Sequence, residues 1–166
     1  MSTDAIVVLK EDHKEIRRLF REFEAAGEDA KATKHNLVDK IVEALTVHTY
    51  IENEVMYPKV RELVPELERD ILESYEEHHV ADVLCGELDA MGPDDERFDA
   101  KTAVLIEVVR QHIDEEEKDW FPKVRAALGR TALQQLGARM IEIRDAAPQR
   151  PGHPGFLKRA TDVILG

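Results

Sequence analysis

Cysteine is nearly absent from this chain of 166 residues, which contains only Cys85. One thiol forms neither an internal disulfide nor a cysteine-built zinc site, and such a composition is typical of reducing compartments. No apolar run approaches the roughly 20 residues that a membrane-spanning helix needs, and the first residues lack the basic region of a secretory signal. We therefore expect a cytoplasmic protein with no membrane partner.

Basic residues are also scarce, since 23 Lys and Arg face 35 Asp and Glu and leave a formal net charge of −12. A surface this acidic repels phosphate backbones, so we expect no nucleic-acid partner. The sequence shows no nucleophile paired with a base and no glycine loop that would cradle a phosphate. Hydrolase and kinase functions therefore have no support.

The few glycines and prolines, 8 and 7 respectively, cluster where apolar residues lose their helical spacing. Spacings of three and four predict helices over residues 4–26, 32–57, 65–90 and 99–121, and Pro58 should kink or stop the second of them. No stretch alternates long enough to be a strand. We therefore predict an all-α fold, an up-down-up-down four-helix bundle within residues 1–128. A short helix from Thr131 to Ala146 and an irregular Pro/Gly-rich tail should complete residues 129–166.

Two segments of the chain repeat each other without a gap. His48 stands four residues before Glu52 and ten before Pro58, and His112 stands at the same distances from Glu116 and Pro122. Pro-Lys-Val-Arg follows in both segments. A further histidine precedes each segment: His13 lies 35 residues before His48, and His78 lies 34 before His112. The chain thus consists of two similar helical hairpins, each with one His and one His-x-x-x-Glu.

The repeated pairs indicate a metal site. One His-x-x-x-Glu would be an ordinary contact between i and i+4 on a helix surface. These two occupy matching places on apolar stripes, with Leu45 and Val55 flanking the first and Val109 and Ile113 adjoining the second. Buried carboxylates on one bundle axis are costly without positive charge. A metal ion would supply that charge. Since residues at i and i+4 share a helix face, one His-x-x-x-Glu pair can present both side chains to the same ion.

Four imidazoles and two carboxylates make a nitrogen and oxygen donor set without thiolate. Calcium and magnesium prefer mostly oxygen, and a structural zinc closes at four ligands. Two carboxylates reaching between two ions suit a dinuclear site, as in di-iron helical bundles. We expect two iron ions with a bridging oxide or hydroxide, although spacing leaves manganese and zinc open.

The order of these residues resembles the hemerythrin-like family, whose domains are called HHE cation-binding, over about residues 4–128. The resemblance implies a four-helix bundle with a non-haem di-iron centre that meets dioxygen, peroxide or nitric oxide. By matching position it implies four terminal ligands and two bridging ones, which are His13, His48, His78 and His112, and Glu52 and Glu116. Oxygen-carrying members have His-x-x-x-His on the third helix, whereas His78 has Ser74 and Asp82 at its ±4 positions. One imidazole is missing.

Two local choices stay open on the third helix. His79 is adjacent to His78 and is the alternative ligand, although the repeat and the apolar face favour His78. Tyr75 lies three residues before His78. It either packs in the core with a hydrogen-bonded hydroxyl, or acts at the metal as a phenol donor or a phenolate ligand, and we take it as the candidate catalytic residue.

The function expected from these features is the reaction of a di-iron site with hydrogen peroxide or dioxygen. Catalase-like disproportionation of peroxide is the favoured activity. Four histidines rather than five leave a coordination position open to a small oxidant. The alternatives are oxygen or nitric-oxide binding and sensing without turnover, and iron storage. The sequence leaves the oligomeric state open.

Overall fold

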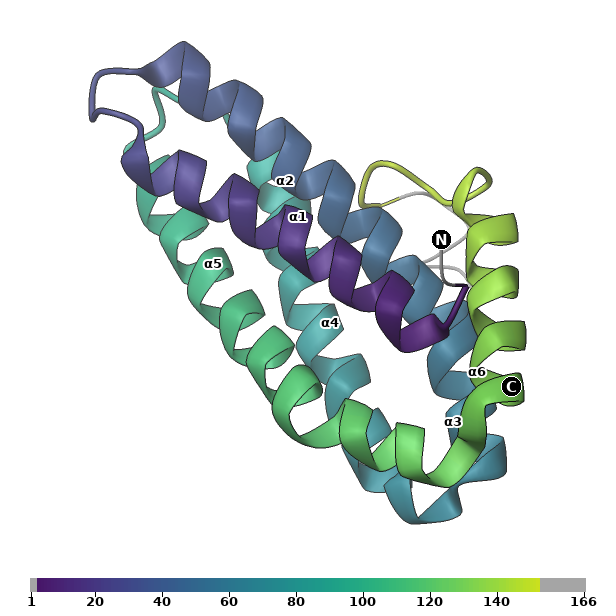
Figure 1. The fold of residues 1–166 in the computed structure, drawn as a ribbon. Helices are drawn as coiled ribbons and strands as arrows, with labels where there is room; N and C mark the ends of the chain where they lie inside the picture. Colours follow the sequence, from purple (N-terminus) through teal and green to yellow (C-terminus); the bar gives the residue numbers. More distant parts are fainter. Residues whose placement is uncertain (1–2, 153–166) are drawn as a thin grey trace.

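The long helices of the bundle carry the architecture (Figure 1). The structure, a computed structural model, describes residues 3–152. Four helices lie alongside one another: α1 (Ala5–Ala25), α2 (Lys31–Ile51), α4 (Glu68–Asp89) and α5 (Phe98–Glu115). Within residues 3–152 there is no β-strand. The predicted all-α four-helix bundle is confirmed.

Two π-helical segments interrupt the helices at the repeated His-x-x-x-Glu pairs. They are η1 (Glu52–Met56) and η3 (Glu116–Trp120), and each begins at the glutamate of a His-x-x-x-Glu pair. The Tyr57 N–H donates to the Glu52 carbonyl oxygen, which is the wide turn of a π-helix. The two halves of the chain therefore repeat each other in backbone geometry as well as in sequence.

Pro58 was predicted to kink or stop the second helix; α2 ends at Ile51, and after η1 the chain continues into α3 (Tyr57–Leu63). Pro58 lies in the first turn of α3, where a missing N–H is tolerated. In the π register its N–H would have served the Asn53 carbonyl oxygen. The Tyr75 hydroxyl donates to that oxygen instead, at 3.3 Å.

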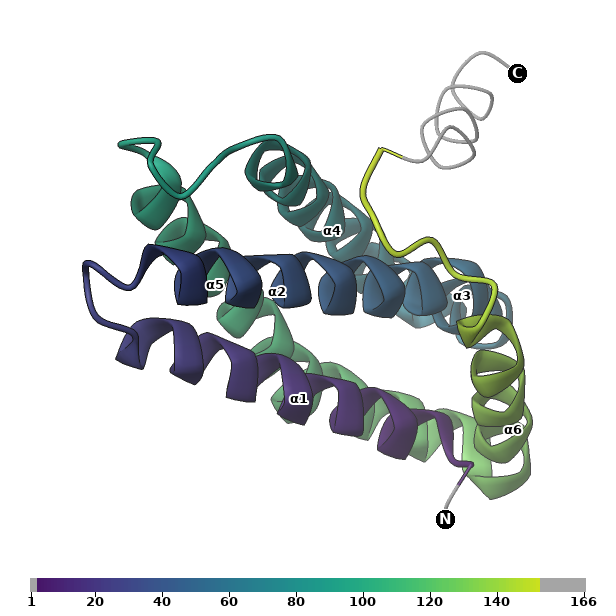
Figure 2. The ribbon, with the colours of Figure 1, turned by 90° about the horizontal axis from the view of Figure 1, so that it is seen from above.

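The C-terminal helix crosses one end of the bundle beside the start of α1 (Figures 1 and 2). A short 3₁₀ turn, η2 (Pro65–Leu67), connects α3 to α4. The C-terminal helix, α6, covers Phe121–Arg144. It contains one non-helical residue, Gly129, at φ 74°. The separate helix predicted to begin at Thr131 is thus the second part of α6. Residues 145–152 form turns and bends, and the rest of the predicted tail lies outside the described residues.

The bundle has two hydrophobic clusters with polar residues between them. One cluster, towards α6, includes Leu9, Ile51 and Phe121, and the other includes Ile16 and Leu45. His13, His48 and His78 fall between these clusters along their helices, and His112 lies beside Ile113 at the end of the second cluster. Among the described residues, no helix has the length and apolarity required to cross a membrane.

Candidate metal centre

Six buried residues from all four long helices meet in the middle of the bundle. They are His13 on α1, His48 on α2, His78 on α4, His112 on α5, and Glu52 and Glu116 at the starts of η1 and η3. None is more than 6% exposed. The structure thus brings together every residue predicted as a metal ligand. Their ligand roles remain a prediction, and we refer to the six as the His–Glu cluster.

The histidines of the cluster form two close pairs, one in each half of the repeat. The Nε2 atoms of His13 and His48 are 3.1 Å apart, as are those of His78 and His112. The rings in both pairs are nearly perpendicular, at 68° and 71°. Each pair therefore aims its Nε2 atoms at one small region, which is the arrangement that a shared metal ion requires.

The two glutamates connect the histidine pairs. Glu52 contacts His48 of its own helix through Oε1, and the same oxygen is 3.9 Å from Nε2 of His78 in the other half. Glu116 mirrors it, with Oε1 against His112 and Oε2 3.9 Å from Nε2 of His13. Each carboxylate thus faces imidazoles from both hairpins. Carboxylates placed in this way could be shared between two ions.

The second ring nitrogen of each histidine, Nδ1, faces an oxygen outside the cluster. The pairs are His48 with Asp12 (3.1 Å), His112 with Glu77 (3.2 Å), His78 with Asn53 (2.8 Å) and His13 with Glu117 (3.9 Å). Every partner is next in sequence to a member of the cluster, at matching places in the two halves. Such contacts hold an imidazole so that Nε2 stays free for a metal.

The carboxylates show that the cluster is short of positive charge. Both oxygens of Glu52 and Oε2 of Glu116 are buried and accept no hydrogen bond within residues 3–152. Burial and the charge of Glu116 raise the pKa of Glu52. Burial opposes protonation of His48, but Glu52 and Asp12 outweigh it and raise the pKa of His48 to about 10. A cation would compensate these carboxylates, so the donor set fits a metal.

Two overlapping groups of donors could each hold an ion. One consists of Glu52, His78, His112 and Glu116, and the other of His13, His48 and Glu52. Within each group the ligand atoms lie within 4.8 Å of one another. The groups share Glu52, which agrees with a carboxylate common to two ions.

The phenol at this cluster is Tyr57, which the sequence analysis did not select. Its hydroxyl donates to Oε1 of Glu116 at 2.9 Å and lies 3.2 Å from Nε2 of His78. Burial, Glu116 and Glu52 raise its pKa, so the phenol keeps its proton. The hydroxyl of Tyr75, by contrast, donates to the backbone oxygen of Asn53.

α-Helical spacing from Glu52 does not point to Tyr57. It lies five residues after Glu52, and only the π turn of η1 brings i and i+5 onto a common face. The available signal was its place in the repeat, directly before the repeated proline. Phe121 holds the matching place and stacks on His13, with ring centroids 5.7 Å apart. At this matched position the two halves therefore differ only in the tyrosine hydroxyl.

The two adjacent histidines of α4 lie in different surroundings. His78 is buried in the cluster, whereas His79 is exposed and lines a surface pocket. On the inner side, a small cavity of about 20 Å³ borders three of the histidines. Its lining is mostly apolar and comprises Leu45, His48, Thr49, Glu77, His78, Ala81, Val108, Val109, His112 and Ile113.

Comparison with known proteins agrees with this geometry. A curated relative, a DNA nickase from Nostoc sp. (strain PCC 7120), is 27% identical over 145 residues, which are 87% of this chain and 40% of the relative. The chain therefore spans less than half the length of that protein. A crystal structure of a hemerythrin HHE cation binding domain-containing protein from Mycobacterium kansasii matches with a TM-score of 0.72, at 24% identity and 86% coverage of each chain, which shows the fold. The family model of the hemerythrin HHE cation binding domain matches residues 4–124. This chain, with its buried His–Glu cluster inside a four-helix bundle, belongs to the hemerythrin HHE cation-binding domain family.

Proposed function

We propose that the His–Glu cluster holds two iron ions and that the protein disproportionates hydrogen peroxide. The observation that carries the proposal is the position of Glu52 and Glu116, each facing imidazoles of both hairpins. Two bound irons would exchange two electrons with peroxide, so that two molecules of hydrogen peroxide give two of water and one of dioxygen. No external reductant enters this balance.

The donor set favours reaction over simple carriage. Neither position one turn from His78, Ser74 or Asp82, belongs to the groups of donors that could hold an ion. A site with four imidazoles therefore leaves coordination space for a small oxidant. The cavity of about 20 Å³ beside His48, His78 and His112 has room for about one water-sized molecule.

In this proposal the proton donor is Tyr57 rather than Tyr75. Its buried hydroxyl lies between Glu116 and His78, within hydrogen-bond distance of both. Peroxide reduction to water requires protons at the departing oxygen, and a phenol whose pKa is raised holds one at neutral pH. Tyr57 therefore both orients Glu116 and holds a transferable proton.

Binding of dioxygen or nitric oxide without turnover is the second candidate. The apolar lining of the small cavity, which includes Leu45, Val109 and Ile113, suits a neutral diatomic molecule as well as peroxide. DNA cleavage, the activity named for the Nostoc relative, is not proposed for this chain, because a net charge of −12 repels the DNA backbone. We place the protein in the cytoplasm, in keeping with its single, buried Cys85.

Metal analysis and an oxygen electrode test the proposal. The protein as isolated should contain about two irons per chain and should release dioxygen from peroxide over many turnovers. Tyr57→Phe should lower kcat by about 10²-fold with iron retained, whereas the matched variant Tyr75→Phe should stay near the wild-type rate. Reversible dioxygen uptake with only a few turnovers on peroxide would favour the binding function, and one zinc per chain would refute the di-iron site.

A further inference from the structure

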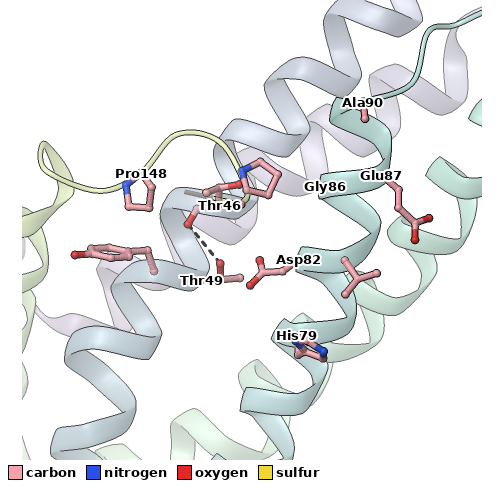
Figure 3. A pocket seen from close by; sticks show the side chains of 12 residues that line it. Thr46, Thr49, His79, Asp82, Gly86, Glu87, Ala90 and Pro148 are labelled. Atoms are coloured by element: carbon pink, nitrogen blue, oxygen red, sulfur yellow. Dashed lines mark hydrogen bonds between the residues drawn. The ribbon is translucent and has the colours of Figure 1, made fainter. Parts of the chain in front are cut away.

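A hollow lies on the surface between α2 and α4, and residues of the C-terminal segment line one side of it (Figure 3). This α2–α4 pocket has a volume of about 420 Å³. Thr46 and Thr49 face it from α2, His79, Asp82 and Gly86 face it from α4, and Pro148 lies at its edge. The function proposed above does not use this pocket.

Thr49 joins the pocket to the interior. It lines both the α2–α4 pocket and the small cavity beside the histidines. It follows His48 directly in sequence and is 6% exposed. Its hydroxyl donates to the Thr46 carbonyl oxygen at 3.4 Å, as the dashed line in Figure 3 marks. Thr49 is the one residue common to the described linings of the two hollows.

The internal repeat provides a comparison, because the seam between α1 and α5 corresponds to the seam between α2 and α4. Arg17 holds the place of Asp82 and forms ion pairs with Asp114 at 2.8 Å and Glu117 at 2.6 Å. Arg110 holds the place of Thr46 and bonds Glu24 at 2.9 Å. Cross-helix ion pairs therefore close the first seam.

The residues on the second seam leave it open. Where Arg17 and Arg110 reach across the first seam, the second has the shorter side chains of Asp82 and Thr46, which both line the α2–α4 pocket. Ile113 takes the place of Thr49, so a larger apolar residue stands at the matching position of the first seam. The two halves thus differ in the side chains along their matching seams, with a pocket at one and ion pairs at the other.

We propose that the α2–α4 pocket is the entrance for the small neutral oxidant and that Thr49 is the gate between this pocket and the His–Glu cluster. The inference rests on the proposed function, because it names the route to the same site. The inner cavity admits only a molecule of about water size. Asp82 and Glu87 at the pocket repel anions, so the route suits hydrogen peroxide, dioxygen or nitric oxide.

The test is the association rate of nitric oxide with the reduced, iron-loaded protein, followed by stopped-flow absorbance. Thr49→Leu adds bulk at the gate and should slow association at least about tenfold, with iron content unchanged. Thr49→Val has almost the size of threonine and should keep the wild-type rate. Unchanged association in Thr49→Leu would overturn the gate.

A second variant keeps the test independent of folding at Thr49. A Cβ built on Gly86 meets nothing within 4 Å, so Gly86→Leu should extend into the pocket without a clash. It should also slow nitric oxide association, whereas Gly86→Ala should not. Wild-type rates in both Thr49→Leu and Gly86→Leu would show that the oxidant enters elsewhere.

Different results would refute the proposed entrance and the proposed reaction. A protein that releases no dioxygen from peroxide but binds nitric oxide slowly in Thr49→Leu refutes disproportionation and supports the route. A protein that turns over peroxide at the same kcat/KM in wild type and Thr49→Leu supports the reaction and refutes the route.

Discussion

At the scale of residues, neighbours in sequence have different tasks because a helix turns by 100° per residue. His78 places Nε2 against His112 inside the cluster, and Asn53 holds its Nδ1. His79, one residue further, faces the surface pocket. The sequence analysis favoured His78 for its place in the repeat, and its burial with the other three histidines adds a geometric reason.

Alanine substitutions separate the two histidines. His78→Ala should lower the metal content, because it removes one of the donors grouped with Glu52. His79→Ala is the matched control and should keep the full metal content, since it removes an exposed side chain. Elemental analysis of both purified variants measures the difference. Equal losses, or a larger loss in His79→Ala, would contradict the assignment.

At the scale of elements, caps and π turns decide where side chains point. Asp4 caps α1, and its Oδ1 accepts hydrogen bonds from the N–H groups of Ile6 and Val7 at 2.9 and 3.2 Å. Arg125 of α6 donates to the same carboxylate at 3.0 Å. Partial burial would raise the pKa of Asp4, but Arg125 and the backbone donors outweigh it and lower the pKa.

Removal of this cap should destabilise the fold. Asp4→Ala should cost about 1 kcal/mol of unfolding free energy at neutral pH, the usual value of an N-cap. Because the folded pKa is depressed, the stabilisation by the charge is present above the unfolded pKa of about 3.9 and is lost as the pH falls through the folded value. Urea unfolding between about pH 7 and pH 2 measures this dependence.

Asp4→Asn is the control for the charge. The amide oxygen can still accept from the helix N–H groups, so this variant should lose less stability than Asp4→Ala at neutral pH. Its difference from wild type should shrink as the pH drops below about 4. A difference that stays constant with pH would show that the charge of Asp4 does not contribute.

At the scale of the whole molecule, α6 connects the end of the bundle to the cluster. Its last residue, Arg144, forms an ion pair with Asp12 at 3.0 Å, and Asp12 in turn contacts His48. Earlier in the helix, Gly137 lies so close to the start of the chain that a Cβ there would sit 1.4 Å from the Thr3 carbonyl oxygen. The packing of α6 on α1 therefore depends on a missing side chain.

Glycine substitutions test this contact. Gly137→Ala should destabilise the protein by about 1–3 kcal/mol or more, because the backbone of Thr3 cannot move away without shifting α1 or α6. Gly86→Ala is the matched change in the interior of a helix with open space, and it should stabilise by up to about 1 kcal/mol. Thermal unfolding of both variants measures the contrast. Similar melting temperatures would contradict the close approach.

Much of the fold and of the candidate centre could be predicted from the sequence, since both depend on local spacing. Apolar residues at three and four located the bundle helices, and the two matched His-x-x-x-Glu pairs, with the histidine that precedes each, selected the six residues that the structure brings together. The sequence did not show that the chain resumes a helix directly after each break, as α3 after the π segment at Pro58 and as the rest of α6 after the non-helical Gly129, because packing against neighbouring helices decides this. The domain boundary at residue 128 stays a prediction.

The helices, the two-fold repeat and the six cluster residues follow from the amino-acid sequence alone. His48 and Glu52, like His112 and Glu116, share a helix face whatever the helix packs against, and the repeat adds His13 and His78. The packing of the helices, by contrast, sets the approach of each carboxylate to both histidine pairs, the contact of Tyr57 rather than Tyr75 with Glu116, and the pocket between α2 and α4. These features depend on a π turn and on contacts between residues up to about a hundred positions apart, such as Arg17 with Glu117. No periodicity within one helix contains that information, because the packing of the helices against each other creates it.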